Sequence, residues 1–524
     1  MHAPIIRPPS PCFGKPGRPP DPVPAAHPQL RGIRLAAMLR LTRFRAGSVW
    51  ALWLAAVMLP RPALAAASTP PLPAEVRQAL RQAQVPPSAL SVWVAPVQRS
   101  TEGPPLLAHQ ADAPMNPASV MKLITTWAGL SLLGPDHTWQ NRVWVTGPVQ
   151  GGVLHGDLVL QGSGDPKLVL ERLRELMQQI RAQGVREIRG DVVLDRSVFD
   201  VQAPTEPFDD EPLRPYNVSP DGLLLNFKAL IYKFEPDTAA GVARLTVEPP
   251  IADVQWPASV PLTPGPCRDW RQQLRGHFGD AQRIRFEGRY PASCGPQEWP
   301  VAYSAPDLHA PRVFKALWLE AGGQLQGQVR WGSTPAQARL LLQAPSLPLS
   351  EVIADINKFS NNVMAQQLFL TLSAQPGVPG RLVASQLRVR QWWRHALPGQ
   401  PEPVLDNGSG LSRNERSTAR ALGALLGSAA GSPLQGVFVQ SLAVAGVDGT
   451  MRRLRERRPD SPLIGRAWLK TGSLRDVASV AGYVDGPGSE RRIVVAIVNH
   501  PSAGQARPAL EAVLEWAARQ PARP

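Results

Sequence analysis

A serine and a lysine with the spacing of a catalytic pair occur in the otherwise apolar stretch MNPASVMKLITTWAGL. Lys122 follows Ser119 by three residues, so both side chains share one face if the stretch is helical. A serine hydroxyl becomes a good nucleophile only when a base removes its proton, and a lysine serves as that base when burial or a nearby cation lowers its pKa. The pair therefore indicates nucleophilic catalysis, with a solvated lysine on a surface helix as the alternative.

The residues around this pair predict the start of a helix. Asn116 and Pro117 are typical of a helix N-cap and of the first helical position, and apolar residues then recur at helical spacing. Ser119 would lie in the first turn, where backbone N–H groups have no intrahelical partner and the helix dipole is positive. Such a turn is suited to hold a developing oxyanion.

A second polar pair occurs in LSEVIADINKFSNNVMAQQLFLTL, which predicts two helices over about 349–357 and 362–372. Ser360 and Asn362 lie in the polar break between them. At a helix junction these side chains can point into a cleft, although an ordinary polar N-cap turn explains the same residues.

A third polar group, Lys470-Thr471-Gly472, lies in WLKTGSL. Two β-branched runs with turn residues between them follow and predict a hairpin. The group would then lie on a strand leading into a sheet edge, where Gly472 lets a ligand backbone approach closely.

The order of these motifs resembles the three signatures of penicillin-binding proteins and serine β-lactamases. The interval between the first two motifs is much longer than that between the last two. In this long first interval the chain resembles the D-alanyl-D-alanine carboxypeptidase/endopeptidases. These are the class C low-molecular-mass penicillin-binding proteins (PBP4/DacB-like, peptidase S13 family). The stretches DNGSGLSR (406–413) and GVDGTMRRL (446–454) also resemble that family, and the likeness runs from about Ala74 to Ala518.

The resemblance implies a serine-type hydrolase acting through an acyl-enzyme. Ser119 would attack the carbonyl of the penultimate residue of a peptide ending in D-Ala-D-Ala, and Lys122 would remove its proton. Ser360 would pass a proton to the departing amine, and Asn362 would position the substrate amide. Lys470 would add a cation that helps to keep Lys122 neutral.

The same resemblance implies a substrate site on the Lys470 strand. The terminal carboxylate of the peptide would face the Thr471 hydroxyl and the Lys470 ammonium, with Gly472 and Ser473 beside it, and the N–H groups of Ser119 and Ser473 would hold the oxyanion. The expected partners are peptidoglycan stem peptides as substrates and β-lactam antibiotics as inhibitors. No cofactor is expected, and no metal, because the histidines and cysteines lack ligand spacing.

Three alternatives stay open at this point. A secreted β-lactamase-like hydrolase would share the motifs, although the chain has no stretch like the Glu-x-x-Leu-Asn of class A deacylation. An endopeptidase would use the same site on a longer leaving group. A catalytically inactive peptidoglycan-binding protein would keep the fold without the chemistry.

Residues 1–65 predict a signal peptide with a preceding unstructured extension. Three arginines precede the apolar stretch Ala46 to Leu59, and the small residues of PALA follow it. Translation would begin at Met1 or at Met38. The segment carries nine Lys or Arg and one acid, so its removal lowers the net charge from +15 to about +7. We therefore expect a periplasmic protein.

The moderately basic mature chain suits peripheral association with the membrane or the cell wall. Its basic residues are scattered and no recognition motif accompanies them, so no nucleic-acid partner is expected. In an exported chain, Cys267 and Cys294 most simply form a disulfide that stabilises by roughly 3 kcal/mol, with two free buried thiols as the alternative.

The expected fold class is α/β (α+β). A strand over 89–98 would join the strands near the C-terminus in one antiparallel sheet, with terminal helices packed on it. The resemblance implies a β-lactamase/transpeptidase-like domain, with an antiparallel sheet flanked by helices, and a large inserted β-rich region. The expected division assigns residues 66–135 and 306–524 to the two parts of the penicillin-binding domain, and residues 136–305 to the insertion.

Overall fold

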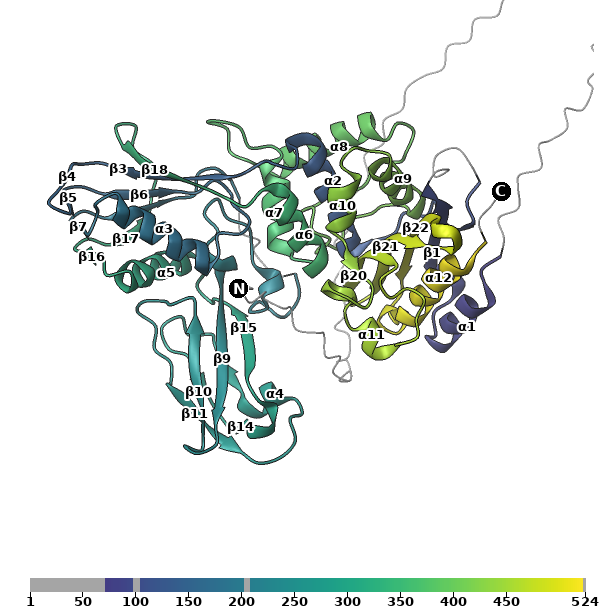
Figure 1. The fold of residues 1–524 in the computed structure, drawn as a ribbon, viewed down its shortest axis with the longest axis horizontal. Coiled ribbons are helices and arrows are strands. Elements are labelled where there is room, and N and C mark those ends of the chain that lie inside the picture. Colours follow the sequence, from purple (N-terminus) through teal and green to yellow (C-terminus); the bar gives the residue numbers. More distant parts are fainter. Residues whose placement is uncertain (1–70, 98–103, 202–207, 522–524) are drawn as a thin grey trace, which may run out of the picture. The chain divides into compact units, whose positions relative to one another are not determined.

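The computed structural model describes residues 71–97, 104–201 and 208–521 (Figure 1). The expected signal peptide lies outside the described residues. Within the described ranges, no helix combines the length and the apolar character needed to cross a membrane.

A six-stranded sheet joins the start of the described chain to its end (Figure 1). The strand order is β19-β20-β21-β22-β1-β2, and neighbours run antiparallel. The strands are β1 (Leu90–Pro96), β2 (Leu107–His109), β19 (Ala443–Val444), β20 (Ala467–Leu474), β21 (Val477–Asp485) and β22 (Arg491–Asn499). Because β1 pairs with β22 along its whole length, the expected union of an early strand with the C-terminal strands is confirmed.

Helices cover both faces of this sheet. Along β22, Ile493, Val495 and Ile497 face one core, whereas Val494, Ala496 and Val498 face the other. The first core contains α2 (Lys122–Leu133), α6 (Leu349–Phe359), α7 (Asn362–Thr371), α8 (Leu382–Ala396) and α9 (Ala419–Ala430), and the second contains α1 (Ala74–Gln82) and α12 (Arg507–Arg519). Burial on both faces explains why the C-terminal strands are continuous apolar runs rather than alternating ones.

Further sheets lie between α2 and α6 in the sequence. Two have five strands, in the orders β17-β8-β6-β3-β18 and β14-β11-β10-β9-β15, and one has four, in the order β16-β7-β5-β4. Their strands are β3 (Gln140–Val145), β4 (Val149–Gln150), β5 (Val153–Leu154), β6 (Leu158–Gln161), β7 (Glu187–Ile188), β8 (Val192–Asp195), β9 (Ala229–Asp237), β10 (Val242–Glu248), β11 (Ser259–Thr263), β14 (Tyr290–Pro291), β15 (Gln297–Ala302), β16 (Gln324–Leu325), β17 (Val329–Trp331) and β18 (Arg339–Pro345). These sheets share one hydrophobic core with two longer helices, α3 (Leu170–Ala182) and α5 (Pro306–Glu320).

The inserted sheets include strands beyond residue 305, where the sequence analysis placed the end of the insertion. β18 pairs with β3, and β16 and β17 pair with β7 and β8. Residues 306–345 thus complete sheets begun by residues 136–305, whereas the sequence analysis assigned them to the second part of the penicillin-binding domain.

A disulfide joins Cys267 to Cys294 within the inserted region, which confirms the expected pairing. It closes a loop with a sequence separation of 27 residues, and the loop contains α4 (Trp270–Leu274) and the β14 strand.

Candidate active site

The Ser119-x-x-Lys122 motif spans a 3-10 turn, η3 (Ala118–Met121), and the first residue of α2. The expected α-helical first turn is therefore a tighter turn. The Asn116 Oδ1 accepts the N–H of Ala118 at 2.9 Å, as an N-cap side chain would. Ala118 has a φ of +46°, which is uncommon for a residue with a Cβ, so the chain enters this turn through a left-handed residue immediately before Ser119.

The C-terminal strands hold this turn in place. Asn499 in β22 accepts the N–H of Asn116 at 2.8 Å and donates its own Nδ2–H to the Asn116 carbonyl at 2.9 Å. From β21, the Ser479 hydroxyl donates to the Pro117 carbonyl at 2.7 Å. Segments more than 360 residues apart in the sequence thus position the nucleophile motif.

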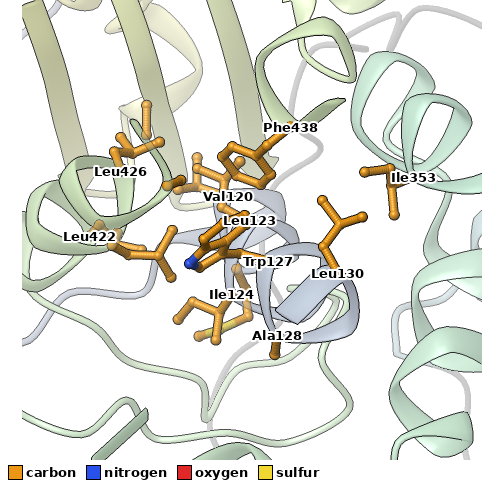
Figure 2. Packing of buried hydrophobic residues seen from close by; sticks show 14 of the residues in the cluster. Val120, Leu123, Ile124, Trp127, Ala128, Leu130, Ile353, Leu422, Leu426 and Phe438 are labelled. Atoms are coloured by element: carbon orange, nitrogen blue, oxygen red, sulfur yellow. The ribbon is translucent and has the colours of Figure 1, made fainter. Parts of the chain in front are cut away.

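Behind the turn, α2 is buried on all sides from Lys122 to Leu130. Figure 2 shows Leu123, Trp127 and Leu130 on α2 packed among side chains of other helices. The Trp127 and Phe438 rings meet edge to face, with centroids 5.3 Å apart. Because side chains in such a core are locked by their neighbours, α2 is a rigid support for Ser119 and Lys122.

Lys122 is fully buried among three oxygen atoms. Its Nζ lies 2.9 Å from the Ser119 Oγ and 2.6 Å from the Asn362 Oδ1, and it contacts the Ser409 carbonyl. The two carbonyl oxygens can only accept hydrogen bonds, whereas the hydroxyl can donate. A neutral amine with two N–H groups directed at the carbonyls therefore turns its lone pair to the Ser119 hydroxyl.

Ser360 and Asn362 lie where the two predicted helices meet. Ser360 adopts a left-handed conformation, with φ +59°, as the C-cap of α6, and Asn361 caps α7 by accepting the N–H of Met364 at 3.1 Å. The Asn362 Nδ2 donates to the Tyr216 carbonyl at 3.1 Å. That bond fixes the orientation of the amide, because its oxygen must then face Lys122.

Lys470 is the second buried lysine of the site. Its Nζ donates to the Ser360 Oγ at 2.9 Å and to the Thr471 carbonyl at 2.7 Å. The structure therefore brings all three motifs together through Lys122, Asn362, Ser360 and Lys470.

Burial lowers the pKa of Lys122 to about 7, and the Glu415 carboxylate opposes this shift. Burial and the Lys122 charge hold the pKa of Lys470 well below its usual range. The sequence analysis expected the Lys470 charge to keep Lys122 neutral, but in the structure the dominant cause for Lys122 is desolvation.

Gly472 is required for close packing within the protein. A Cβ on this residue would lie 2.9 Å from the Ser119 nitrogen and 2.7 Å from the Pro117 carbonyl oxygen. The bare backbone of β20 therefore passes directly beside the η3 turn, whereas the sequence analysis expected the glycine to admit a ligand.

The second half of β20 is an open edge. Within the described residues, β19 pairs only with Trp468 and Leu469, so residues 470–474 have a neighbour strand on one side alone. Thr471 is partly exposed there, and its hydroxyl donates to the Thr450 hydroxyl at 2.9 Å. Ser473 is exposed and lies opposite Ala478 of β21. An extended peptide can add to such an edge.

Several residues at the site were given no role by the sequence analysis. Ser409 supplies the carbonyl that contacts Lys122, Thr450 contacts Thr471, and Glu415 is a fully buried acid whose charge acts on Lys122. The first two lie in the quoted stretches 406–413 and 446–454, which had been noted only for their likeness to a family. Glu415 follows two residues after the first of these stretches and carries no motif of its own.

Within the described ranges, no group of three or more His, Cys, Asp or Glu side chains could hold a metal ion.

Comparisons with known proteins identify the family. The family model for the D-Ala-D-Ala carboxypeptidase 3 (S13) family matches residues 72–520. A D-alanyl-D-alanine carboxypeptidase from Actinomadura sp. is 30% identical over 428 residues, which are 77% of this chain and 77% of that protein.

Solved structures show the same fold. Penicillin binding protein 4 (dacB) from Haemophilus influenzae superposes with a TM-score of 0.69 at 21% identity, covering 85% of this chain and 99% of that chain. The same protein complexed with a β-lactam gives a TM-score of 0.63 at 22% identity, covering 84% of this chain and 99% of that chain. The expected fold class is thus confirmed, and with it the hydrolase class that the motifs implied. The chain belongs to the D-Ala-D-Ala carboxypeptidase 3 (S13) family.

Proposed function

We propose that this protein is a serine-type D-Ala-D-Ala carboxypeptidase of peptidoglycan stem peptides, with Ser119 as the nucleophile and Lys122 as the base. The observation that carries the proposal is the surrounding of the Lys122 amine, whose Nζ contacts two obligate acceptors and lies 2.9 Å from the Ser119 Oγ. A neutral amine that gives its N–H groups to the two acceptors would turn its lone pair to the Ser119 hydroxyl. A lysine with a pKa near 7 is largely neutral above that pH, as a general base must be.

The catalytic steps follow from these positions. Lys122 takes the Ser119 proton as the Oγ attacks the carbonyl carbon of the penultimate residue, and the oxyanion forms beside the backbone of the η3 turn and the β20 edge. Ser360, hydrogen-bonded to Lys470, delivers a proton to the departing D-Ala amine. Water then hydrolyses the ester on Ser119 and releases the shortened peptide.

The substrate binds along the β20 edge in this proposal. Its terminal carboxylate faces the Thr471 hydroxyl and the Lys470 side chain, and Gly472 and Ser473 continue the edge. A β-lactam carries a carboxylate beside a reactive amide, so it would occupy the same place and acylate Ser119. The Haemophilus influenzae penicillin binding protein 4 has been solved complexed with a β-lactam.

The protein would act in the periplasm after cleavage of the signal peptide. Endopeptidase cleavage of cross-linked stem peptides would use the same site with a longer leaving group. The segment around Tyr216 would meet this group, since the Tyr216 carbonyl accepts a hydrogen bond from the Asn362 side chain.

Fluorescent penicillin and a D-Ala-D-Ala peptide test the proposal. The wild-type protein should be labelled covalently and should release D-Ala, whereas Ser119→Ala should do neither. A matched control is Ser131→Ala, which removes a hydroxyl of α2 that hydrogen-bonds only the Trp127 carbonyl within the described residues. Stable labelling of Ser119→Ala would exclude Ser119 as the nucleophile, and an unlabelled wild-type protein would favour an inactive peptidoglycan-binding protein.

A further inference from the structure

Glu415 is a buried carboxyl group for which the proposed mechanism has no use. Its side chain has no exposed surface, although a charged carboxylate is costly to bury without a partner cation. One oxygen, Oε2, has no hydrogen-bond partner among the described residues. Such a group requires a physical explanation.

The other oxygen of Glu415 organises a turn of the active site. Its Oε1 accepts the N–H of Asp406 at 3.2 Å and that of Gly408 at 2.9 Å. The next residue, Ser409, supplies the carbonyl that contacts the Lys122 Nζ. Glu415 therefore holds the turn that fixes one of the two N–H groups of the base.

The same turn is fastened to α2. The Thr125 hydroxyl, one helical turn beyond Lys122, donates to the Gly408 carbonyl at 2.6 Å. Gly408 has a φ of +73°, and a Cβ there would lie 2.8 Å from the Thr125 Oγ1. The turn has therefore little freedom to relax if the Glu415 contacts are lost.

The charges around Glu415 connect it to the base. The net effect of its surroundings raises the pKa of Glu415 to about 7, because the effect of burial outweighs the hydrogen bonds from the Gly408 and Asp406 N–H groups, which lower the pKa. Of the neighbouring charges, Asp406 raises this pKa and Lys122 lowers it. Arg416 binds the main-chain carbonyl of Glu415 and not its carboxyl group. Because Lys122 also has a pKa of about 7, the two groups compete for one proton near neutral pH.

We propose that Glu415 is a positioning residue of the catalytic base, which fixes the Ser409 carbonyl and whose negative charge retains the proton on Lys122. The proposal rests on the function proposed above. While Lys122 is protonated, its amine cannot accept the Ser119 proton, and the charge of the Glu415 carboxylate stabilises this blocked form. As the pH rises, Lys122 loses its proton to solvent and becomes competent as a base. The buried acid thus sets the lower pH limit of acylation.

Two variants separate the two roles. Glu415→Gln keeps an oxygen acceptor for both N–H groups and removes the charge, so the midpoint of the acid limb of penicillin acylation should fall by about one pH unit while the plateau rate stays within a few fold. Glu415→Asp keeps the charge but is shorter by one methylene, so the plateau rate should drop about tenfold or more while the midpoint stays near that of wild type.

The measurement is the second-order rate of acylation by fluorescent penicillin across the range from mildly acidic to mildly alkaline pH, with circular dichroism confirming the fold of each variant. Glu515→Gln is the matched control. Glu515, on α12, is also buried, but it pairs with Ser461 and Arg458. This variant should change neither the midpoint of the acid limb nor the plateau rate.

An unchanged midpoint in folded Glu415→Gln overturns the charge coupling. A wild-type plateau in Glu415→Asp overturns the positioning of the Ser409 carbonyl. If the wild-type protein itself is not acylated, the proposed function fails, whereas normal wild-type acylation with unaltered variants refutes only the role of Glu415.

Discussion

Replacement of Lys122 by methionine should change how the stability of the protein depends on pH. The unfolded chain keeps the Lys122 proton up to about 10.5, the ordinary pKa of a solvated lysine, whereas burial lowers the pKa to about 7 in the folded protein. Between these values the unfolded state binds more protons, so the free energy of unfolding of the wild type rises with pH through this group. Lys122→Met lacks this contribution.

The size of the effect follows from the two pKa values. From pH 7 to pH 9 the Lys122 term adds about 2 kcal/mol to the stability of the wild type, at about 1.36 kcal/mol per unit. The lost contacts to Asn362 and Ser409 cost the variant roughly 1 to 3 kcal/mol, but this cost does not vary with pH. Without the Lys122 charge, Glu415 in the variant keeps its proton up to a higher pH. The stability of the variant then falls further as the pH rises, so the stability difference from wild type changes in the same direction.

Urea unfolding of both proteins at pH 7, 8 and 9, with the disulfide intact, measures this difference. The stability of Lys122→Met relative to wild type should fall by about 2 kcal/mol over the range. Lys315→Met, which removes an exposed lysine paired with Asp253, is the control and should show a nearly constant difference. Parallel pH curves for Lys122→Met and wild type would mean that Lys122 keeps an ordinary lysine proton affinity, and the base assignment would have to be abandoned.

Three other changes test separate parts of the site and fold. Thr471→Val should reduce hydrolysis of D-Ala-D-Ala peptides far more than acylation by a neutral ester, because charge-assisted bonds to a carboxylate are about twice as strong as neutral ones; equal losses would refute carboxylate recognition. Gly472→Ala should lower penicillin acylation about 100-fold, since its Cβ would lie 2.9 Å from the Ser119 nitrogen, and a wild-type rate would contradict the close packing. Cys267→Ser with Cys294→Ser should lower the free energy of unfolding by about 2 to 4 kcal/mol in urea titrations while penicillin labelling persists, and unchanged stability would contradict the role of this cross-link.

Much of the fold could be predicted because its signals are local. The helical periods around Ser360 and Asn362 located α6 and α7 to within two residues, and the β-branched runs located the β21–β22 hairpin. The insertion boundary depends on strand pairing between distant segments, such as β3 with β18, and no local pattern encodes that partner. The sequence therefore located the motifs better than the region between them.

The active site shows the same limit. Residue types and order placed Ser119, Lys122 and Lys470 in one site, since their chemistry is recognisable in the chain. The Ser409 carbonyl is a backbone atom, which any residue could supply, and Glu415 has no distinguishing spacing. These groups matter because the Ser409 carbonyl points at Lys122 and the Glu415 carboxyl group is buried. Both properties are defined only in the folded chain.

In the proposed mechanism, the inserted region also helps to orient the base. If the Asn362 amide were reversed, its NH₂ group would face the Lys122 amine, and a neutral lysine would have to turn its lone pair there instead of toward Ser119. The Tyr216 carbonyl prevents this reversal by accepting the Asn362 Nδ2–H, and Tyr216 belongs to the insertion. In the proposed mechanism, one backbone carbonyl of the insertion, through Asn362, and one turn held by Glu415, through Ser409, thus direct the two N–H groups of the base. The lone pair of a neutral Lys122 would then face Ser119, because both carbonyls are fixed by residues outside the three motifs.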